Sequence, residues 1–170
     1  MVPTWDLVLL VFFAASLIYG FLMGKDKILV TILGAYVGLV IANQWGDRVF
    51  NFVAQQTEIL NTGWMQGSLS IFVAKVVLFA FVLLIIAMKG GWLVRPVLGG
   101  GGVFGMVLPL VYSMASAVLI AASVLDFLPE ETRGQVIEKS MVAAPLVHYY
   151  AVWLVLPVII IWVSSWFTKE

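Results

Sequence analysis

Two charged side chains, in or beside long apolar stretches, are the residues of this sequence best placed to do chemistry. Lys75 is the single charge within the apolar runs 7–22, 28–42, 71–88 and 103–125, and Asp6 directly precedes the first run. An ionised group inside a bilayer is costly and usually marks a functional site. Three readings of Lys75 stay open: its stem reaches the headgroups, it forms an intramembrane charge pair with Asp6, or it belongs to a functional polar site.

Other reactive groups are few. The chain has one histidine, His148, and no cysteine, which excludes thiol catalysis, disulfides and a metal site of several histidines within one chain. A serine–lysine dyad would need Lys75 with Ser68 or Ser70, and no feature marks either serine as a nucleophile. The glycine run at 99–102 lacks the G-x-x-x-x-G-K-[ST] pattern and the preceding strand of a nucleotide site. We therefore expect no enzyme activity, no cofactor and no metal.

The elements that must position these residues are membrane helices. A helix of about 20 apolar residues crosses the hydrocarbon core, and lipid offers no partner to unpaired backbone groups. Hydrophobic residues make up 63% of the 170 residues and charged residues only 11%, so we expect no separate soluble domain. The net charge is zero, and no basic face indicates nucleic acid. We predict an all-α polytopic transmembrane helix bundle, a single domain over 1–170, with four transmembrane helices (about 4–24, 27–45, 68–89 and 102–126) and a fifth C-terminal membrane segment (141–167).

The links between these segments alternate in charge. The first and third links carry more basic than acidic residues, whereas the second and fourth carry more acidic residues. Basic links stay in the cytoplasm, so we predict a multi-pass protein with its N-terminus outside. Indole rings favour both headgroup regions, and five tryptophans fall near the two predicted interfaces: Trp5, Trp45, Trp64, Trp92 and Trp166.

The fifth segment contains two prolines that allow two readings. Pro145 suits the first turn of a helix, whereas Pro157 falls in the interior, where proline kinks a helix. The reading we favour has residues 141–167 crossing once with a kink. In the other reading, residues 144–156 lie in the interface and 157–167 enter the membrane separately.

Glycines spaced by four recur on three of the predicted helices. Such glycines share a helix face on which backbones can approach closely, and we expect them to pack helices within one chain, with homo-oligomer contacts as the alternative. The pairs are Gly20 with Gly24, Gly34 with Gly38, and Gly101 with Gly105. We also predict a hinge or close helix crossing at Gly99 and Gly100, and a bend at Pro109 in the fourth helix.

With these features in place, the chain resembles the colicin V production protein family of bacterial inner-membrane proteins. Asp6 matches the family's early aspartate, and residues 20–24, Gly-Phe-Leu-Met-Gly, are similar to its Gly-Phe-x-x-Gly helix end. Residues 95–105 resemble its Arg-x-Leu-Gly-x-x-x-Gly segment, with one extra residue before the leucine. Residues 138–145, beginning Glu-Lys-Ser-Met, resemble its C-terminal Lys-Ser…Pro element. The departures are a longer glycine run, a more apolar tail, and Pro109 where a further glycine would fall.

The resemblance implies a role in colicin V production or export, or in envelope maintenance, at the bacterial inner membrane. We expect that role to be non-enzymatic. The resemblance supplies no catalytic residues to carry over. The partners we expect are the lipid bilayer and either a second copy or another membrane protein. The alternative is a small oligomeric transporter or channel, whose polar path would follow the serines of the fourth helix: Ser113, Ser116 and Ser123.

Overall fold

The structure is a computed structural model that describes residues 4–57, 68–93 and 103–167. Regular structure in these ranges is helical, with no strand. The helices are α1 (Trp5–Met23), α2 (Lys25–Thr57), α3 (Ser68–Leu93), α4 (Val103–Asp126), α5 (Glu130–Lys139), α6 (Ala143–His148) and α7 (Tyr150–Phe167).

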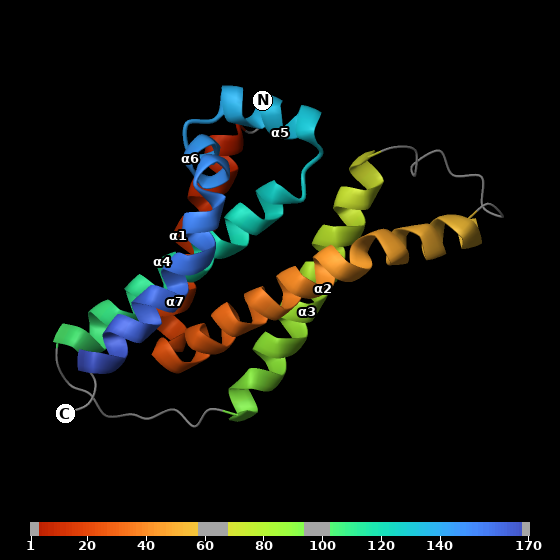
Figure 1. The fold of residues 1–170 in the computed structure, drawn as a ribbon. Helices are drawn as coiled ribbons and strands as arrows, with labels where there is room; N and C mark the ends of the chain where they lie inside the picture. The colour runs from red at the N-terminus through yellow and green to blue at the C-terminus, as the bar shows by residue number, and fades with distance from the viewer. Residues whose placement is uncertain (1–3, 58–67, 94–102, 168–170) are drawn as a thin grey trace.

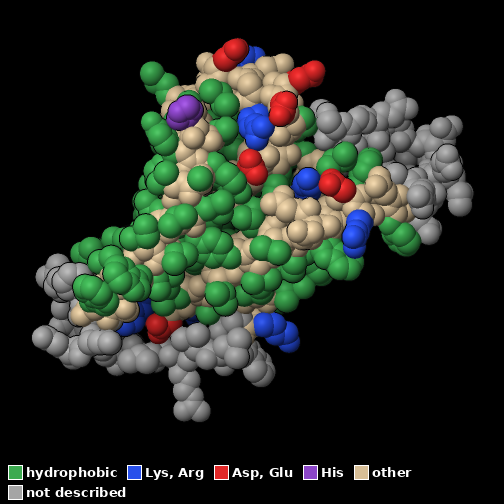
Figure 2. Space-filling view, viewed as in Figure 1, with side chains coloured by type: hydrophobic (Ala, Val, Ile, Leu, Met, Phe, Trp, Pro, Cys, Tyr) green, Lys and Arg blue, Asp and Glu red, His purple; other side chains and the backbone are tan. Residues whose placement is uncertain are grey.

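The chain is a polytopic transmembrane helix bundle, as its composition predicts. Four stretches are long and apolar enough to cross a membrane: Trp5–Met23, Lys25–Val53, Ile71–Lys89 and Val107–Asp126. The helix α7 is a shorter apolar helix near the C-terminus. In Figure 1, α1, α3 and α7 run in one direction and α2 and α4 in the other, so that the start of α1, α5 and α6 share one end of the bundle. Figure 2 shows hydrophobic side chains over much of the viewed face, with charged side chains toward the α5 end, along the opposite edge, and in a group on the right over α2 and α3.

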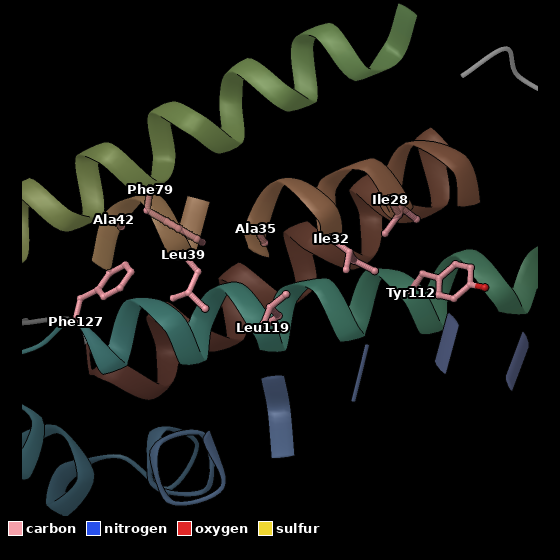
Figure 3. Close-up of a cluster of buried hydrophobic side chains, with 9 residues drawn as sticks. All are labelled: Ile28, Ile32, Ala35, Leu39, Ala42, Phe79, Tyr112, Leu119 and Phe127. Carbon is pink, nitrogen blue, oxygen red and sulfur yellow. The ribbon is translucent and has the colours of Figure 1, made fainter. Parts of the chain in front are cut away.

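The helix α4 is the centre of the packing. It contacts α1, α2, α6 and α7, whereas α3 packs mainly on α2. The buried face of α2 repeats at intervals of four and three residues, which places its members on one side of a helix. This face meets α3, α4 and the residue that follows α4 in the core of Figure 3: Ile28, Ile32, Ala35, Leu39, Ala42, Phe79, Tyr112, Leu119 and Phe127.

A second core seats the two short helices, α5 and α6, which we call the cap. Apolar side chains of the cap, Val136, Ala143 and Leu146, are buried with Leu9 of α1 and Leu125 of α4. The cap thus rests on the first and fourth helices, at the end of the bundle where α1 begins.

One predicted boundary is wrong, and one predicted link contains a helix, because a helix does not need apolar residues to continue. The second helix, predicted to end near residue 45, runs on to Thr57, and no proline interrupts it. The link predicted over 126–140 contains α5, which has Glu130 and Glu131 in its first turn and Lys139 in its last. Charges of these signs suit the two ends of a helix.

The C-terminal segment breaks at a different residue from the one predicted. Pro157 lies inside α7. The break falls at Tyr149, between the end of α6 at His148 and the start of α7, with φ −104° and ψ 30°. The Trp153 indole N–H donates to the Pro145 carbonyl at 3.0 Å and so connects α7 to α6 across the break. Neither predicted reading of this segment places the break at Tyr149.

Candidate functional site

The carboxylate of Asp6 joins the first helix to the cap. Its Oδ1 atom accepts hydrogen bonds from the Ser140 hydroxyl at 2.5 Å and from the Val142 backbone N–H at 3.1 Å. The Ser140 oxygen in turn accepts the Ala143 N–H at 2.9 Å. Ser140 is only 2% exposed, and a buried hydroxyl needs such partners. One aspartate near the N-terminus therefore closes the turn that begins α6.

A second polar joint ties the cap to α4 and α7. Arg133 of α5 donates from Nη1 to Asp126 Oδ1 at 3.2 Å, and its Nη2 lies 3.9 Å from Glu130 Oε1. The side chain of Tyr150, the first residue of α7, interacts with Asp126 and Ser123. Because these charges are partly exposed to solvent, the ion pairs contribute little to the free energy of unfolding. Their main effect is to orient α5.

The polar side chains at this end of the bundle hold the cap on the membrane helices. Ser140 donates its proton to a carboxylate and accepts an amide proton, so its oxygen is engaged in holding the turn and is not paired with a histidine base. His148 is exposed and meets the Tyr149 ring edge-on, with ring centroids 5.0 Å apart. Among the residues that the structure describes, no group of three or more His, Cys, Asp or Glu side chains could hold a metal ion.

Lys75 pairs with a residue other than Asp6, its candidate partner. Its Nζ lies 3.4 Å from Asp47 Oδ1 of α2. Its stem crosses Gly46, where an added Cβ would lie 2.5 Å from Lys75 Cγ. The candidate pair of Asp6 and Lys75 is not formed, because similar depth does not make two helices neighbours: α3 packs on α2, and α1 packs on α4. Asp6 bonds to the cap instead.

Three of the predicted packing glycines lie at helix crossings within the chain. An added Cβ at each would meet a side chain of the neighbouring helix at about 3 Å or less. The facing pairs are Gly20 with Ser113, Gly34 with Ile86, and Gly38 with Phe79. Gly24 does not pack in this way, since an added Cβ there would meet nothing within 4 Å. Its φ of +76° instead lets the chain leave α1 and enter α2.

The predicted hinge falls mostly outside the described residues. Gly99, Gly100 and Gly101 lie there, and Gly105 lies in the first turn of α4 without described surroundings. Pro109 is buried inside α4, and the helix continues through it to Asp126.

Sequence reasoning missed the partners of both charges. A serine just before an apolar segment is a typical helix-capping residue, and that pattern could have singled out Ser140. Nothing in the sequence connects it with Asp6, because a contact between residues 134 positions apart depends on how α1 packs beside α6. Gly46 and Asp47 fall in the predicted second link, where no feature of the sequence marks them as neighbours of Lys75.

Comparisons with protein-family models, with curated proteins and with solved structures find no match to this chain.

Proposed function

We propose that this chain is a non-catalytic inner-membrane protein of the colicin V production type, which supports toxin production or export, or envelope maintenance. The observation that carries the proposal is the hydrogen bond between Asp6 and Ser140. The resemblance rests on separate motifs, among them an early aspartate and a C-terminal Lys-Ser…Pro element. These two motifs meet in one contact, which gives both a shared purpose: to seat the cap on α1.

In this proposal the membrane helices form a frame and the cap is the surface that acts on a partner. The charge balance of the links supports an orientation with the N-terminus outside. The cap shares the N-terminal end of the bundle, so it would stand on the outer face, toward exported protein and the rest of the envelope. Its first turn presents Glu130 and Glu131, both exposed, to such a partner.

A bacterial host that lacks its own colicin V production protein provides the test. The chain should restore secreted colicin V activity or resistance of the envelope to detergent. Asp6→Ala and Ser140→Ala should each lower that restoration, whereas Glu138→Ala, an exposed position of the same motif, should not. Membrane fractionation must show equal amounts of each variant. Failure of the unaltered chain, present in the inner membrane at the level of the host protein, to restore either property would refute the proposal.

The serines of α4 give little support to the alternative, a small oligomeric transporter or channel. Its polar path would need exposed serines, and Ser113, Ser116 and Ser123 are instead buried within the chain. The Ser113 hydroxyl donates to the Ser16 carbonyl, and the Ser123 hydroxyl donates to a carbonyl of its own helix. Ion flux through proteoliposomes that contain the chain would favour this alternative over the first proposal.

A further inference from the structure

An apolar groove of about 270 Å³ lies along α2, lined by Tyr36, Val37, Val40 and Ile41. Val37 and Val40 are 41% and 60% exposed, so the groove is open on its outer side. Tyr36 turns its polar end away, because its hydroxyl donates to the Leu154 carbonyl of α7 at 2.5 Å. These residues belong to the stretch of α2 that can cross a membrane. An acyl chain is therefore the ligand whose chemistry fits the groove.

A cation lies on the same side of α2, further along the helix. Arg48 follows Ile41 by seven residues and Val37 by eleven, and at 3.6 residues per turn both intervals return to within about 20° of the same direction. The Arg48 guanidinium carbon lies 5.7 Å from the centre of the Trp45 ring, a cation–π contact that orients the group. The adjacent carboxylate, Asp47, pairs with the lysine of α3. Arg48 is thus the cation that α2 presents above the groove.

The distance between the charged residues near the two ends of α2 places Arg48 at the headgroup level of a membrane. From Lys27 to Arg48 is 21 residues, or about 32 Å at 1.5 Å per residue, which is close to the thickness of the hydrocarbon core. Trp45 is 55% exposed, and exposed indoles favour the headgroup level. Val40 and Ile41 precede Arg48 by eight and seven residues, so they lie about 10–12 Å closer to the membrane centre than Arg48 does.

We infer that α2 binds a phospholipid of the leaflet at its Arg48 end, with the phosphate on the Arg48 guanidinium and one acyl chain in the groove. A guanidinium presents parallel N–H donors that match the oxygens of a phosphate. The contact with Trp45 holds that group where the phosphate would lie. The inference is independent of the proposed function, since none of its residues belongs to the cap or to its joints.

Native mass spectrometry of the full chain, released from nanodiscs of phosphatidylglycerol or of phosphatidylcholine, tests the site. We expect one phospholipid to stay bound. Its apparent dissociation constant should rise about tenfold in Arg48→Gln, because a hydrogen bond to a charged group contributes about that factor. Val40→Trp should displace the lipid by filling the groove.

Two matched controls keep the test specific. Lys27→Gln removes a cation from the opposite end of α2. Val77→Trp places an indole at a valine of α3 that is 61% exposed, against 60% for Val40. Circular dichroism of all four variants establishes that each keeps its helices before lipid retention is compared.

Loss of the retained lipid in both test variants, with both controls unchanged, supports the site. Equal retention of the two lipids would then identify the phosphate as the recognised group, and a preference for phosphatidylglycerol would show that net charge adds to it. Unchanged retention in the test variants, or equal losses in the controls, would overturn the inference. A change of oligomeric mass in Val40→Trp, with lipid retention unaltered, would show that a second copy covers the groove and would overturn it as well.

Discussion

Replacing Gly20 by alanine should weaken the contact between α1 and α4. An added Cβ would lie 2.5 Å from Ser113 Oγ and 3.2 Å from Ile28 Cδ1. Both neighbours are held in place, since Ser113 and Ile28 are each 1% exposed and the Ser113 hydroxyl is bonded to the Ser16 carbonyl. The clash involves atoms close to the Ser113 backbone, so a change of rotamer cannot relieve it and the two helices must separate.

The size of the effect follows from two opposing contributions. Overpacking a well-filled site costs about 1–3 kcal/mol, whereas alanine in a helix interior is better than glycine by about 1 kcal/mol. With two buried neighbours in the way, we expect the upper part of the first range and a net loss of about 1–2 kcal/mol. Gly134→Ala in α5 is the matched control, because an added Cβ there meets nothing within 4 Å. It should raise stability by about 0.5–1 kcal/mol.

The free energies of unfolding can be compared in mixed micelles of increasing SDS content, followed by circular dichroism and tryptophan fluorescence. The double variant Gly20→Ala with Ser113→Gly removes the clashing atoms and should recover most of the loss, giving a coupling energy between the two sites. If Gly20→Ala gains stability as Gly134→Ala does, the reasoning fails, because α1 and α4 then do not meet through Gly20.

Two further predictions use the absence of native cysteine. Asp6→Cys combined with Ser140→Cys should be joined in membranes by a short bifunctional thiol reagent, because the Asp6 carboxylate and the Ser140 hydroxyl are in contact at 2.5 Å. Asp6→Cys combined with Lys75→Cys should not be joined. The opposite result would contradict the described packing of α1 on the cap and of α3 on α2. Gly134→Cys should react with a membrane-impermeant maleimide added to intact cells, and Lys25→Cys only after the cells are opened. Labelling of both from the same side would refute a crossing by α1.

The fold class was predictable because the constraint is simple and strong. Backbone groups in lipid must bond within their own helix, so an apolar run such as 71–88 is sufficient to predict the part of α3 that crosses the membrane. The end of α2 was not predictable in the same way. Beyond Trp45 the chain leaves the apolar run but keeps residues that tolerate a helix, and hydropathy does not distinguish a continued helix from a link.

The candidate site was predictable only in part, for a related reason. An aspartate at the start of an apolar helix and a lysine inside another are visible as anomalies in the sequence, and Asp6 and Lys75 are both engaged in polar contacts. Their partners depend on which helices become neighbours. That choice is made by side-chain packing around Ile32 and Leu119 in one core and Leu9 in the other. The period of the apolar residues shows which face of a helix is buried, but it does not show which helix covers that face.

Three consecutive residues of α2, Gly46, Asp47 and Arg48, lie in the predicted second link, and each has a different role. Gly46 lacks the side chain that would block the stem of Lys75, so the lysine can cross α2. Asp47 then lies within 3.4 Å of the lysine and neutralises it. Successive residues on a helix are about 100° apart, so Arg48 faces a different side, over Trp45 and above the groove. A larger residue at Gly46 should therefore displace Lys75 and return an unpaired acidic charge beside Arg48, which would weaken phosphate binding without any change to the groove itself.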